Sequence, residues 1–479
     1  MNKKKKLISN YIYNMMFTSL NLLFPLITLP YVSRIIGVDG IGKVNFANSI
    51  VNYFLMVASL GIPLYGVREI AKVRNDKERL SNTFSEIFTI NLLSTIFCIT
   101  IYYLMVSNME YFKNDRTLFY ISGISLLLNI LNIDWFFQGL EEYRFIAIRS
   151  SIVKLISIIL LFIFVRNRSD YIIYALINVI ALSGNNIINI MNMTKITKIS
   201  FKNLNIKNRI APISILLSIQ VAISIYANLD TTMCGILANN ESVGFYSNAV
   251  KINRVIVTIV ISISTILLPR LSYYVENNMM NEFEKIVNLV FKMLLFIGIP
   301  VMIGSFILSK EIIIIMFGSE FIPAIITMKI LSPLIILLSI GNLFGTQVLV
   351  PLGKEKKLLI SVLIGSIINF TLNLILIPIY KENGAAFATV VAEFIIMVVQ
   401  VYFSKKQIRV YLSFKEFITI IISNISMLIV IIILKIILSN ILLTLILSII
   451  LGGGVYLIVN IIMKNCLIIE IMKKIRLIK

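Results

Sequence analysis

The sequence contains no histidine, and only 3 cysteines and 1 tryptophan occur among its 479 residues. Without histidine, the chain lacks a common zinc ligand and the side chain that most often shuttles protons near neutral pH. The cysteines Cys98, Cys234 and Cys466 are scattered, so they predict neither a disulfide framework nor a metal-binding spacing. We therefore expect no metal, no cofactor and no enzyme active site based on histidine.

Charge is also scarce, since charged residues make up 14% of the chain and hydrophobic residues 58%. Successive apolar stretches of roughly 20 residues run from Tyr11 to Met463, and this is the length that a helix needs to cross a bilayer. Little sequence is left for a soluble domain. The pattern predicts an all-α membrane protein with about 14 transmembrane helices. The expected spans are 10–33, 42–66, 81–106, 117–139, 144–165, 170–193, 211–236, 242–268, 285–308, 322–350, 358–379, 384–403, 416–438 and 441–463.

Acidic residues are much fewer than basic ones: 23 Asp and Glu stand against 44 Lys and Arg, which gives a net charge of +21. Such an excess can indicate nucleic-acid binding, but its placement here indicates membrane topology. Most Lys and Arg fall in alternate joints between spans, as the positive-inside rule predicts for cytoplasmic loops. These clusters lie at 3–6, 67–80, 195–210, 405–409 and 473–476. We expect both termini in the cytoplasm and no nucleic-acid partner.

An internal repeat is visible after the first and the seventh spans. The segment 41–47 resembles 243–249, and 170–175 resembles 383–388. Since each copy holds six helices, both copies would have the same orientation, related by an axis along the membrane normal, with the substrate path between them. The expected parts are an N-lobe at 1–194 with helices 1–6, a cytoplasmic linker at 195–210, a C-lobe at 211–404 with helices 7–12, and helices 13–14 with a basic cytoplasmic tail at 405–479.

One short motif imitates a nucleotide-binding loop. Gly37–Lys43 fits the spacing G-x-x-x-x-G-K, but Val44 replaces the Ser or Thr that would hold magnesium. The segment also lies between two spans, with no preceding buried strand. We interpret it as a tight glycine turn between helices, and we expect no ATP-driven transport.

Ionisable residues inside apolar spans are the strongest functional signal, because a charge at mid-membrane normally faces a cavity or a partner. Lys251 and Arg254 lie three residues apart on span 8, close to Asn248. Lys43, Asn48 and Asn52 form a similar polar stretch on span 2. Cations suit phosphate and amides suit hydroxyl groups, so the pattern favours an anionic, hydroxyl-rich ligand. Polar contacts between helices remain the alternative explanation.

Other charges inside or beside the spans are candidates for gating or ion coupling. They are Asp134, Lys154, Asp230, Lys292, Lys329 and Glu393. For Asp134, Arg149 and Arg34, which lie near helix ends, snorkelling to the membrane surface is an alternative. Lys435 lies outside the repeat and suits a lobe-surface or lipid contact. The single Trp135 is typical of an interfacial anchor.

Three segments resemble one family of membrane proteins. They are Leu29–Gly37 followed by Gly40–Gly42, Val67–Ala71 before a basic joint, and Asp134–Glu141. All three resemble Wzx-type polysaccharide repeat-unit flippases of the multidrug/oligosaccharidyl-lipid/polysaccharide (MOP) exporter superfamily, which also contains the MATE transporters. The likeness covers essentially the whole chain.

The resemblance implies two six-helix lobes and a function. That function is translocation of an undecaprenyl-diphosphate-linked oligosaccharide to the outer leaflet of a bacterial cytoplasmic membrane, for O-antigen or capsule synthesis. It also implies alternating access through a cationic central cavity, lined at the matching positions by Arg34, Lys43, Lys251 and Arg254. The expected partners are the lipid-linked oligosaccharide, membrane lipids, a polysaccharide polymerase and a chain-length regulator, with the chain itself a monomer.

Two relatives in the same superfamily are alternatives. A lipid II flippase carries an Arg-Asp pair midway through its first helix, whereas this chain has no charge between Phe17 and Pro25. Drug or cation antiporters usually need cavity carboxylates, whereas Lys and Arg outnumber acidic residues inside these spans. A membrane-bound glycosyltransferase, polymerase or ligase is a third class. Such enzymes usually carry a sizeable outer loop with catalytic carboxylates or histidine, which is absent from the expected topology.

Overall fold

The computed structural model describes residues 3–200, 204–265, 267–405, 407–408 and 410–465. Within these ranges the regular secondary structure is helical, with no strand. In this described part, 10 helical segments are long and apolar enough to cross a membrane. The all-α membrane class is therefore confirmed, whereas the count of about 14 spans stays a prediction. Most of the basic tail expected at the carboxyl terminus, including Lys473 and Arg476, lies outside the described residues.

The contacts divide the chain into two compact units, Met1–Gly235 and Ile236–Lys479. This boundary differs from the lobe boundary that the sequence suggested at 195–210. The reason is the helix α9 (Lys207–Leu237), whose carboxyl-terminal part bonds to the first unit. Thr232 Oγ1 on α9 donates to the Ser49 hydroxyl at 2.9 Å. Most of α9 therefore belongs with the residues that precede it.

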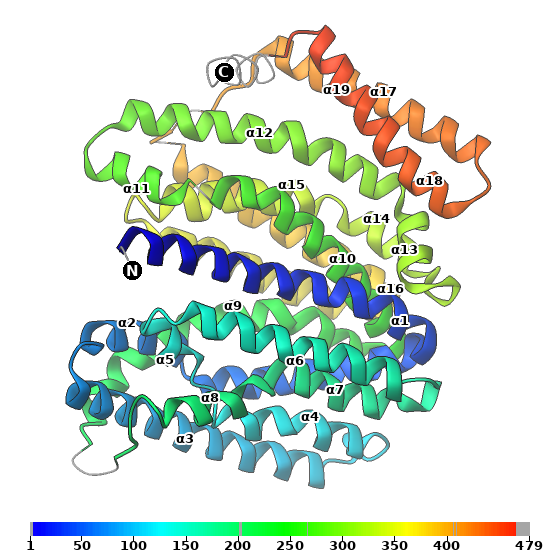
Figure 1. Cartoon of the computed structure of the whole chain (residues 1–479). Helices are drawn as coiled ribbons and strands as arrows, with labels where there is room; N and C mark the ends of the chain where they lie inside the picture. The colour runs from blue at the N-terminus through cyan, green and yellow to red at the C-terminus, as the bar shows by residue number, and fades with distance from the viewer. Residues whose placement is uncertain (1–2, 201–203, 266, 406, 409, 466–479) are drawn as a thin grey trace. The chain divides into compact units, whose positions relative to one another are not determined.

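The first unit is a bundle of long helices joined by short turns (Figure 1). Its helix α3 packs along both α2 and α4, and its helix α1 packs against α6. The buried core on one side of the unit is aromatic, with Phe84, Phe136 and Phe137 fully enclosed. The elements before α9 are α1 (Lys3–Ser59), α2 (Ile62–Val73), α3 (Lys77–Asn108), η1 (Glu110–Phe112), α4 (Arg116–Asn129), α5 (Asp134–Gly139), α6 (Tyr143–Phe164), η2 (Arg168–Asp170), α7 (Tyr171–Ser183) and α8 (Asn185–Met193).

The helix α1 is interrupted at Gly37, where φ is 75° and ψ is −176°. This left-handed region is open to glycine at little steric cost and strained for residues that carry a Cβ. The interruption divides the segment into two helical pieces, as the sequence predicted for the first two spans. The predicted break between helices is thus found at Gly37, while the rest of the segment Gly37–Lys43 is helical.

Trp135 is buried within the protein, whereas the sequence suggested an anchor exposed at the membrane interface. Its side chain is only 2% exposed and stacks on Phe84 with ring centroids 5.6 Å apart. Gly66 permits this packing, because a Cβ there would lie 2.4 Å from the indole ring. Trp135 is therefore a core residue that joins α5 to α2 and α3.

The start of α9 and the residues just before it are held against α2 and α3 by ion pairs and a hydrogen bond. Arg209 lies 3.0 Å from a Glu69 carboxylate oxygen and 2.9 Å from a Glu86 carboxylate oxygen. The backbone N–H of Asn205 also donates to Glu86 at 2.9 Å. The described part of the predicted linker is thereby fixed to α2 and α3.

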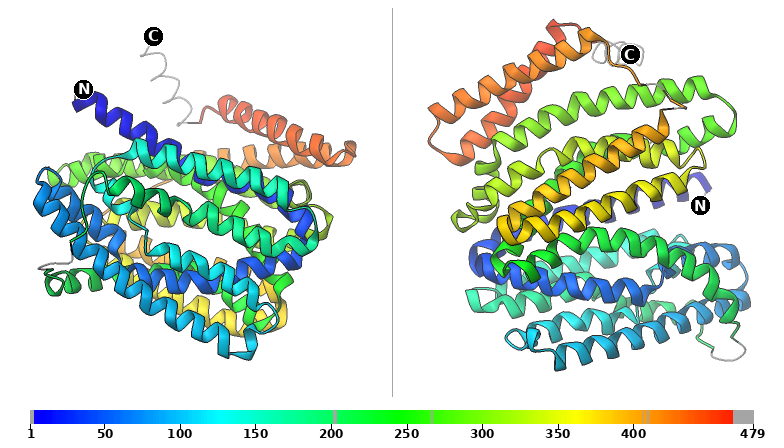
Figure 2. Two further views of the ribbon diagram at one scale, coloured as in Figure 1. Left: turned by 60° about the horizontal axis from the view of Figure 1, so that its bottom comes forward. Right: turned by 180° about the vertical axis from the view of Figure 1, so that it is seen from behind.

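The second unit contains the remaining helices, and the last three described α-helices form a carboxyl-terminal hairpin. Figure 2 shows this hairpin, which we define as residues 414–462, in orange and red. The helix that precedes it in the chain, α16, is interrupted at Lys381, where φ is 51°. The elements are α10 (Asn240–Thr265), α11 (Leu268–Glu276), α12 (Met280–Ile307), α13 (Ser309–Phe317), η3 (Ser319–Phe321), α14 (Ala324–Leu331), α15 (Leu334–Asn342), η4 (Leu343–Leu349), α16 (Glu355–Ser404), α17 (Phe414–Ile437), α18 (Ile441–Leu447), η5 (Ser448–Gly452) and α19 (Gly453–Ile462).

Two ion pairs fasten the hairpin to the rest of the second unit. At the start of α17, Glu416 lies 2.8 Å from the Lys292 ammonium of α12. Near the end of α17, Lys435 lies 3.0 Å from Glu311 of α13 and also donates to the carbonyl oxygen of Ile307. Lys435 is thus a partner for an acidic residue of the unit and not simply a lipid contact.

Candidate functional site

The helices α1 and α6 of the first unit run in the same direction along a shared seam. At one end, Phe17 of α1 and Ile146 of α6 line one pocket. At the other end, the Tyr31 hydroxyl donates to the Val165 carbonyl at 2.8 Å. Residue numbers increase together along both helices, so the pair is parallel. We call this contact the α1/α6 seam.

Lys154 lies in the middle of the α1/α6 seam and is only 7% exposed. Its ammonium donates to the side-chain oxygen of Asn21 and lies 5.7 Å from the centroid of the Phe24 ring. Among the residues that the structure describes, no carboxylate lies within ion-pair distance of it. Because a buried charge without a counter-ion is costly, this position is suited to an anionic ligand.

Asp134 lies near the same seam but already has a partner. Its carboxylate is 3.0 Å from the Arg149 guanidinium, whose side chain is 2% exposed. The Asn189 amide donates to Asp134 at 2.6 Å and accepts from Arg149. The three side chains join α5, α6 and α8 in a closed polar group. This geometry favours a structural role for Asp134 over the gating or ion-coupling role that the sequence suggested.

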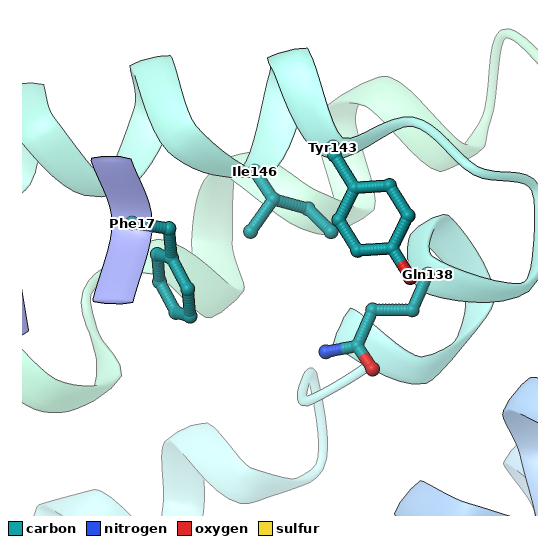
Figure 3. A pocket seen from close by; sticks show the side chains of 4 residues that line it. All are labelled: Phe17, Gln138, Tyr143 and Ile146. Atoms are coloured by element: carbon teal, nitrogen blue, oxygen red, sulfur yellow. The ribbon is translucent and has the colours of Figure 1, made fainter. Parts of the chain in front are cut away.

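A pocket of about 240 Å³ opens at the end of the seam where α5 meets α6. Figure 3 shows Phe17 from α1, Gln138 from α5, and Tyr143 and Ile146 from α6 around it. Within the described part of the chain, the Gln138 amide and the Tyr143 hydroxyl have no hydrogen-bond partner. The pocket therefore combines aromatic walls with polar groups that are open to a ligand. The pocket was not predictable from the sequence, because its lining residues come from three separate helices.

Lys43, a predicted ligand-binding residue, lies in an ion-pair network. Its ammonium is 3.3 Å from Asp39 and 3.5 Å from Asp115, and Tyr171 donates to Asp115 at 3.0 Å. The Lys43–Asp39 ion pair was predictable, because residues four apart lie on the same face of a helix. The contact with Asp115 was not, because Asp115 is distant in sequence. Arg34 is exposed on α1 and donates to the Pro30 carbonyl at 2.9 Å.

The predicted asparagines of span 2 lie on α1 beyond the glycine turn. Asn48 is half-buried, and Asn52 donates to the Asn228 side chain of α9 at 3.3 Å. Asp230 lies on α9, two residues from Asn228, and is 7% exposed. Asn52 and the turn of α9 that carries Asp230 are therefore brought together inside the first unit.

In the second unit, Lys251 and Arg254 both lie on α10, one turn apart. Lys251 is half-buried and Arg254 is exposed, while the neighbouring Asn248 is fully buried. Asn253 fixes this stretch of α10, because its amide donates to the Leu331 carbonyl of α14 at 2.9 Å. Lys251 and Arg254 thus lie on the same helix as two asparagines, and the Asn253 hydrogen bond holds that helix against α14.

The remaining predicted charges of the second unit are dispersed. Lys292 pairs with Glu416 and lies 4.8 Å from the Tyr411 ring, which indicates a structural anchor for α17. Lys329 on α14 is half-buried, 5.7 Å from the Phe306 ring. Glu393 is half-buried on α16.

Known proteins with this arrangement of helices are membrane transporters. The structure of the lipid II flippase MurJ in an inward closed conformation aligns with a TM-score of 0.77 and 20% identity, over 96% of this chain and 100% of MurJ. An inward-facing MATE-family multidrug transporter of the MOP superfamily gives a TM-score of 0.65 with 12% identity, over 82% of this chain and 97% of the transporter. The chain therefore has the fold of these transporters.

The family model described as "Polysaccharide biosynthesis protein" matches residues 7–275, and the chain belongs to that family. A protein of Escherichia coli (strain K12) named as an O-antigen transporter is 26% identical over 81% of this chain and 94% of its own length. The capsular polysaccharide biosynthesis protein CapF of Staphylococcus aureus is 24% identical over 84% of this chain and 100% of its own. The resemblance stated from the motifs is thus confirmed, as is the expectation of a protein that is not an enzyme.

Proposed function

We propose that this protein is a polysaccharide flippase that moves an undecaprenyl-diphosphate-linked oligosaccharide from the cytoplasmic to the outer leaflet. The observation that carries the proposal is Lys154, a buried cation in a membrane helix with no acidic partner among the described residues. A diphosphate supplies the missing negative charge, and such charge-assisted hydrogen bonds are stronger than neutral ones. The relatives named for O-antigen and capsule support the glycan part of the cargo.

In the proposed mechanism, cations of both units contact the head group at different stages of an alternating-access cycle. Lys154, Lys251 and Arg254 would contact phosphate, while the amides of Asn48, Asn52 and Asn248 would contact hydroxyl groups. Arg34 and the paired Lys43 would act at a gate that opens when Lys43 exchanges its carboxylates for cargo. Asp230, Lys329 and Glu393 remain the candidates for ion coupling.

The membrane potential favours the proposed direction of transport. Moving one elementary charge through 100 mV changes the free energy by about 2.3 kcal/mol, so an inside-negative potential favours outward movement of a diphosphate. Export of lipophilic cations would be opposed by Lys154, Lys251 and Arg254. Contacts with a polymerase and a chain-length regulator, and a monomeric state, stay predictions.

Purified protein in vesicles should move a labelled polyprenyl-diphosphate oligosaccharide between leaflets, faster when the potential favours it. The double variant Lys251→Ala/Arg254→Ala should lose nearly all of this movement, because two adjacent positive charges are removed from α10. Its yield and unfolding temperature should stay close to wild type. Efflux of ethidium without lipid movement by the wild-type protein would instead favour a drug exporter.

We also infer that both termini and the joint at 74–76 face the cytoplasm, because basic clusters lie on that side. In a background without native cysteine, Asn75→Cys should be protected from impermeant thiol reagents in intact cells. Asn167→Cys, on the opposite side, should react. Both positions are exposed, so the difference would report the side of the membrane. The reverse labelling pattern would overturn the orientation.

A further inference from the structure

We propose that the pocket formed by Phe17, Gln138, Tyr143 and Ile146 is a saccharide subsite that binds one sugar ring of the cargo head group. The inference rests on the proposed function, because it assumes that the cargo carries sugars. It assigns a binding role to residues that carry no net charge. The pocket lies wholly within the first unit, between α1, the end of α5 and the start of α6.

The chemistry of the lining matches a sugar ring. A sugar has hydroxyl groups around its rim and patches of C–H on its faces, so it needs polar partners at the edge and aromatic or apolar walls. Gln138 offers a carbonyl acceptor and two amide donors, and Tyr143 offers a hydroxyl that donates and accepts. Phe17 and Ile146 provide the apolar walls (Figure 3).

The hydrogen-bonding state of these polar groups also indicates a ligand. Gln138 and Tyr143 are both half-buried, yet within the described residues neither side chain bonds to protein. The Asn189 amide of α8, by contrast, contacts both Asp134 and Arg149. The two unbonded groups share one pocket, so they are available together to a hydroxyl-bearing ring.

The size of the pocket favours a single ring over a larger ligand. Its volume is about 240 Å³, while sites for drug-sized molecules span about 300–1,000 Å³. The four lining residues include neither an acidic nor a basic side chain, so the pocket is poorly suited to a metal ion, a free phosphate or a cationic drug. A purely hydrocarbon chain would leave Gln138 and Tyr143 without partners.

The position of the pocket relative to Lys154 fits the order of groups in the cargo. Ile146 and Lys154 lie eight residues apart on α6, which corresponds to about 12 Å along the helix axis. In a lipid-linked oligosaccharide, the diphosphate connects the lipid directly to the first sugar. A phosphate beside Lys154 would therefore place the sugars toward Tyr143 along the α1/α6 seam, next to Gln138.

Equilibrium binding to the full-length protein in nanodiscs tests the subsite with two labelled probes. One probe is the lipid-linked oligosaccharide extracted from cells that make the glycan, and the other is polyprenyl diphosphate without sugar. Gln138→Leu should weaken binding of the first probe about tenfold and leave the second unchanged. Tyr143→Phe, which keeps the ring and removes one hydroxyl, should weaken the first probe about threefold. The matched control Tyr380→Phe alters an exposed tyrosine of the second unit and should change neither.

The outcomes separate the subsite from the proposed function. If both pocket variants bind the two probes as wild type does, or weaken both probes equally, the saccharide subsite is wrong. If the selective weakening is found but wild-type protein in vesicles moves no lipid, the subsite stands and the flippase proposal fails. Phe17→Tyr should bind the sugar-bearing probe better than Phe17→Leu, because only tyrosine preserves the aromatic wall.

Discussion

Replacing Lys154 by methionine is expected to lower lipid translocation about 100-fold while raising the stability of the protein. The loss follows from removing the cation that pairs with phosphate, since truncating one member of a buried charge pair costs about 2–5 kcal/mol. The gain in stability follows because the unliganded protein no longer buries an ammonium group that lacks a carboxylate partner in the described structure. Function and stability should thus move in opposite directions.

The measurements are translocation in vesicles and the thermal unfolding midpoint in detergent. Lys154→Arg should keep part of the transport, because it retains the positive charge. Lys356→Met is a matched control, since Lys356 is exposed at the start of α16 and should affect neither quantity. If Lys154→Met transports normally, Lys154 does not bind the cargo; if it transports poorly because it unfolds, its role is structural.

Removing the charge of Asp134 is expected to destabilise the protein by about 3–5 kcal/mol, because Arg149 would remain buried without its counter-ion. The variant Asp134→Asn preserves the shape of the side chain, so packing should change little. Arg149 is 2% exposed while Asp134 is 29% exposed, and therefore Arg149→Met alone should cost less. The measurement is the unfolding midpoint of purified protein, compared under one detergent condition.

The double variant Asp134→Asn/Arg149→Met distinguishes a structural pair from an ion-coupling residue. If the two charges only support each other, the double variant should be more stable than Asp134→Asn, and it should transport. If the double variant is stable but has lost its response to an ion gradient, Asp134 takes part in coupling after all. Equal stability of wild type and Asp134→Asn would contradict the predicted energetic role of the pair.

The sequence predicted where charges would lie but not which of them would have partners. From the sequence, three lysines inside or beside apolar spans could not be distinguished: Lys43, Lys154 and Lys292. The structure gives Lys43 and Lys292 carboxylate partners from helices distant in sequence, Asp115 and Glu416 respectively. Among the described residues, Lys154 contacts the Asn21 amide and the Phe24 ring and no carboxylate. An ion pair between two helices forms only if each helix is rotated and shifted along its axis so that the two side chains meet. The hydrophobic pattern of the sequence does not determine either of these.

The fold class was predictable because the bilayer constrains it strongly: each crossing needs a long apolar helix with its backbone internally bonded. The turn at Gly37 was predictable for a local reason, the steric freedom of glycine. Burial of Trp135 against Gly66 was not, since it depends on two helices approaching closely. The assignment of α9 to the first unit likewise depends on side-chain bonds such as that between Thr232 and Ser49.

The fastening of the hairpin at residues 414–462 has a consequence for how the protein is made. A lysine in the middle of an apolar helix opposes entry of that helix into lipid by about 2.5–3.5 kcal/mol, and less toward the ends. Glu311, the acidic partner of Lys435, is synthesised well before α17 leaves the ribosome. The order of translation thus supplies the anion first, and the hairpin meets a docking point already present when it enters the membrane.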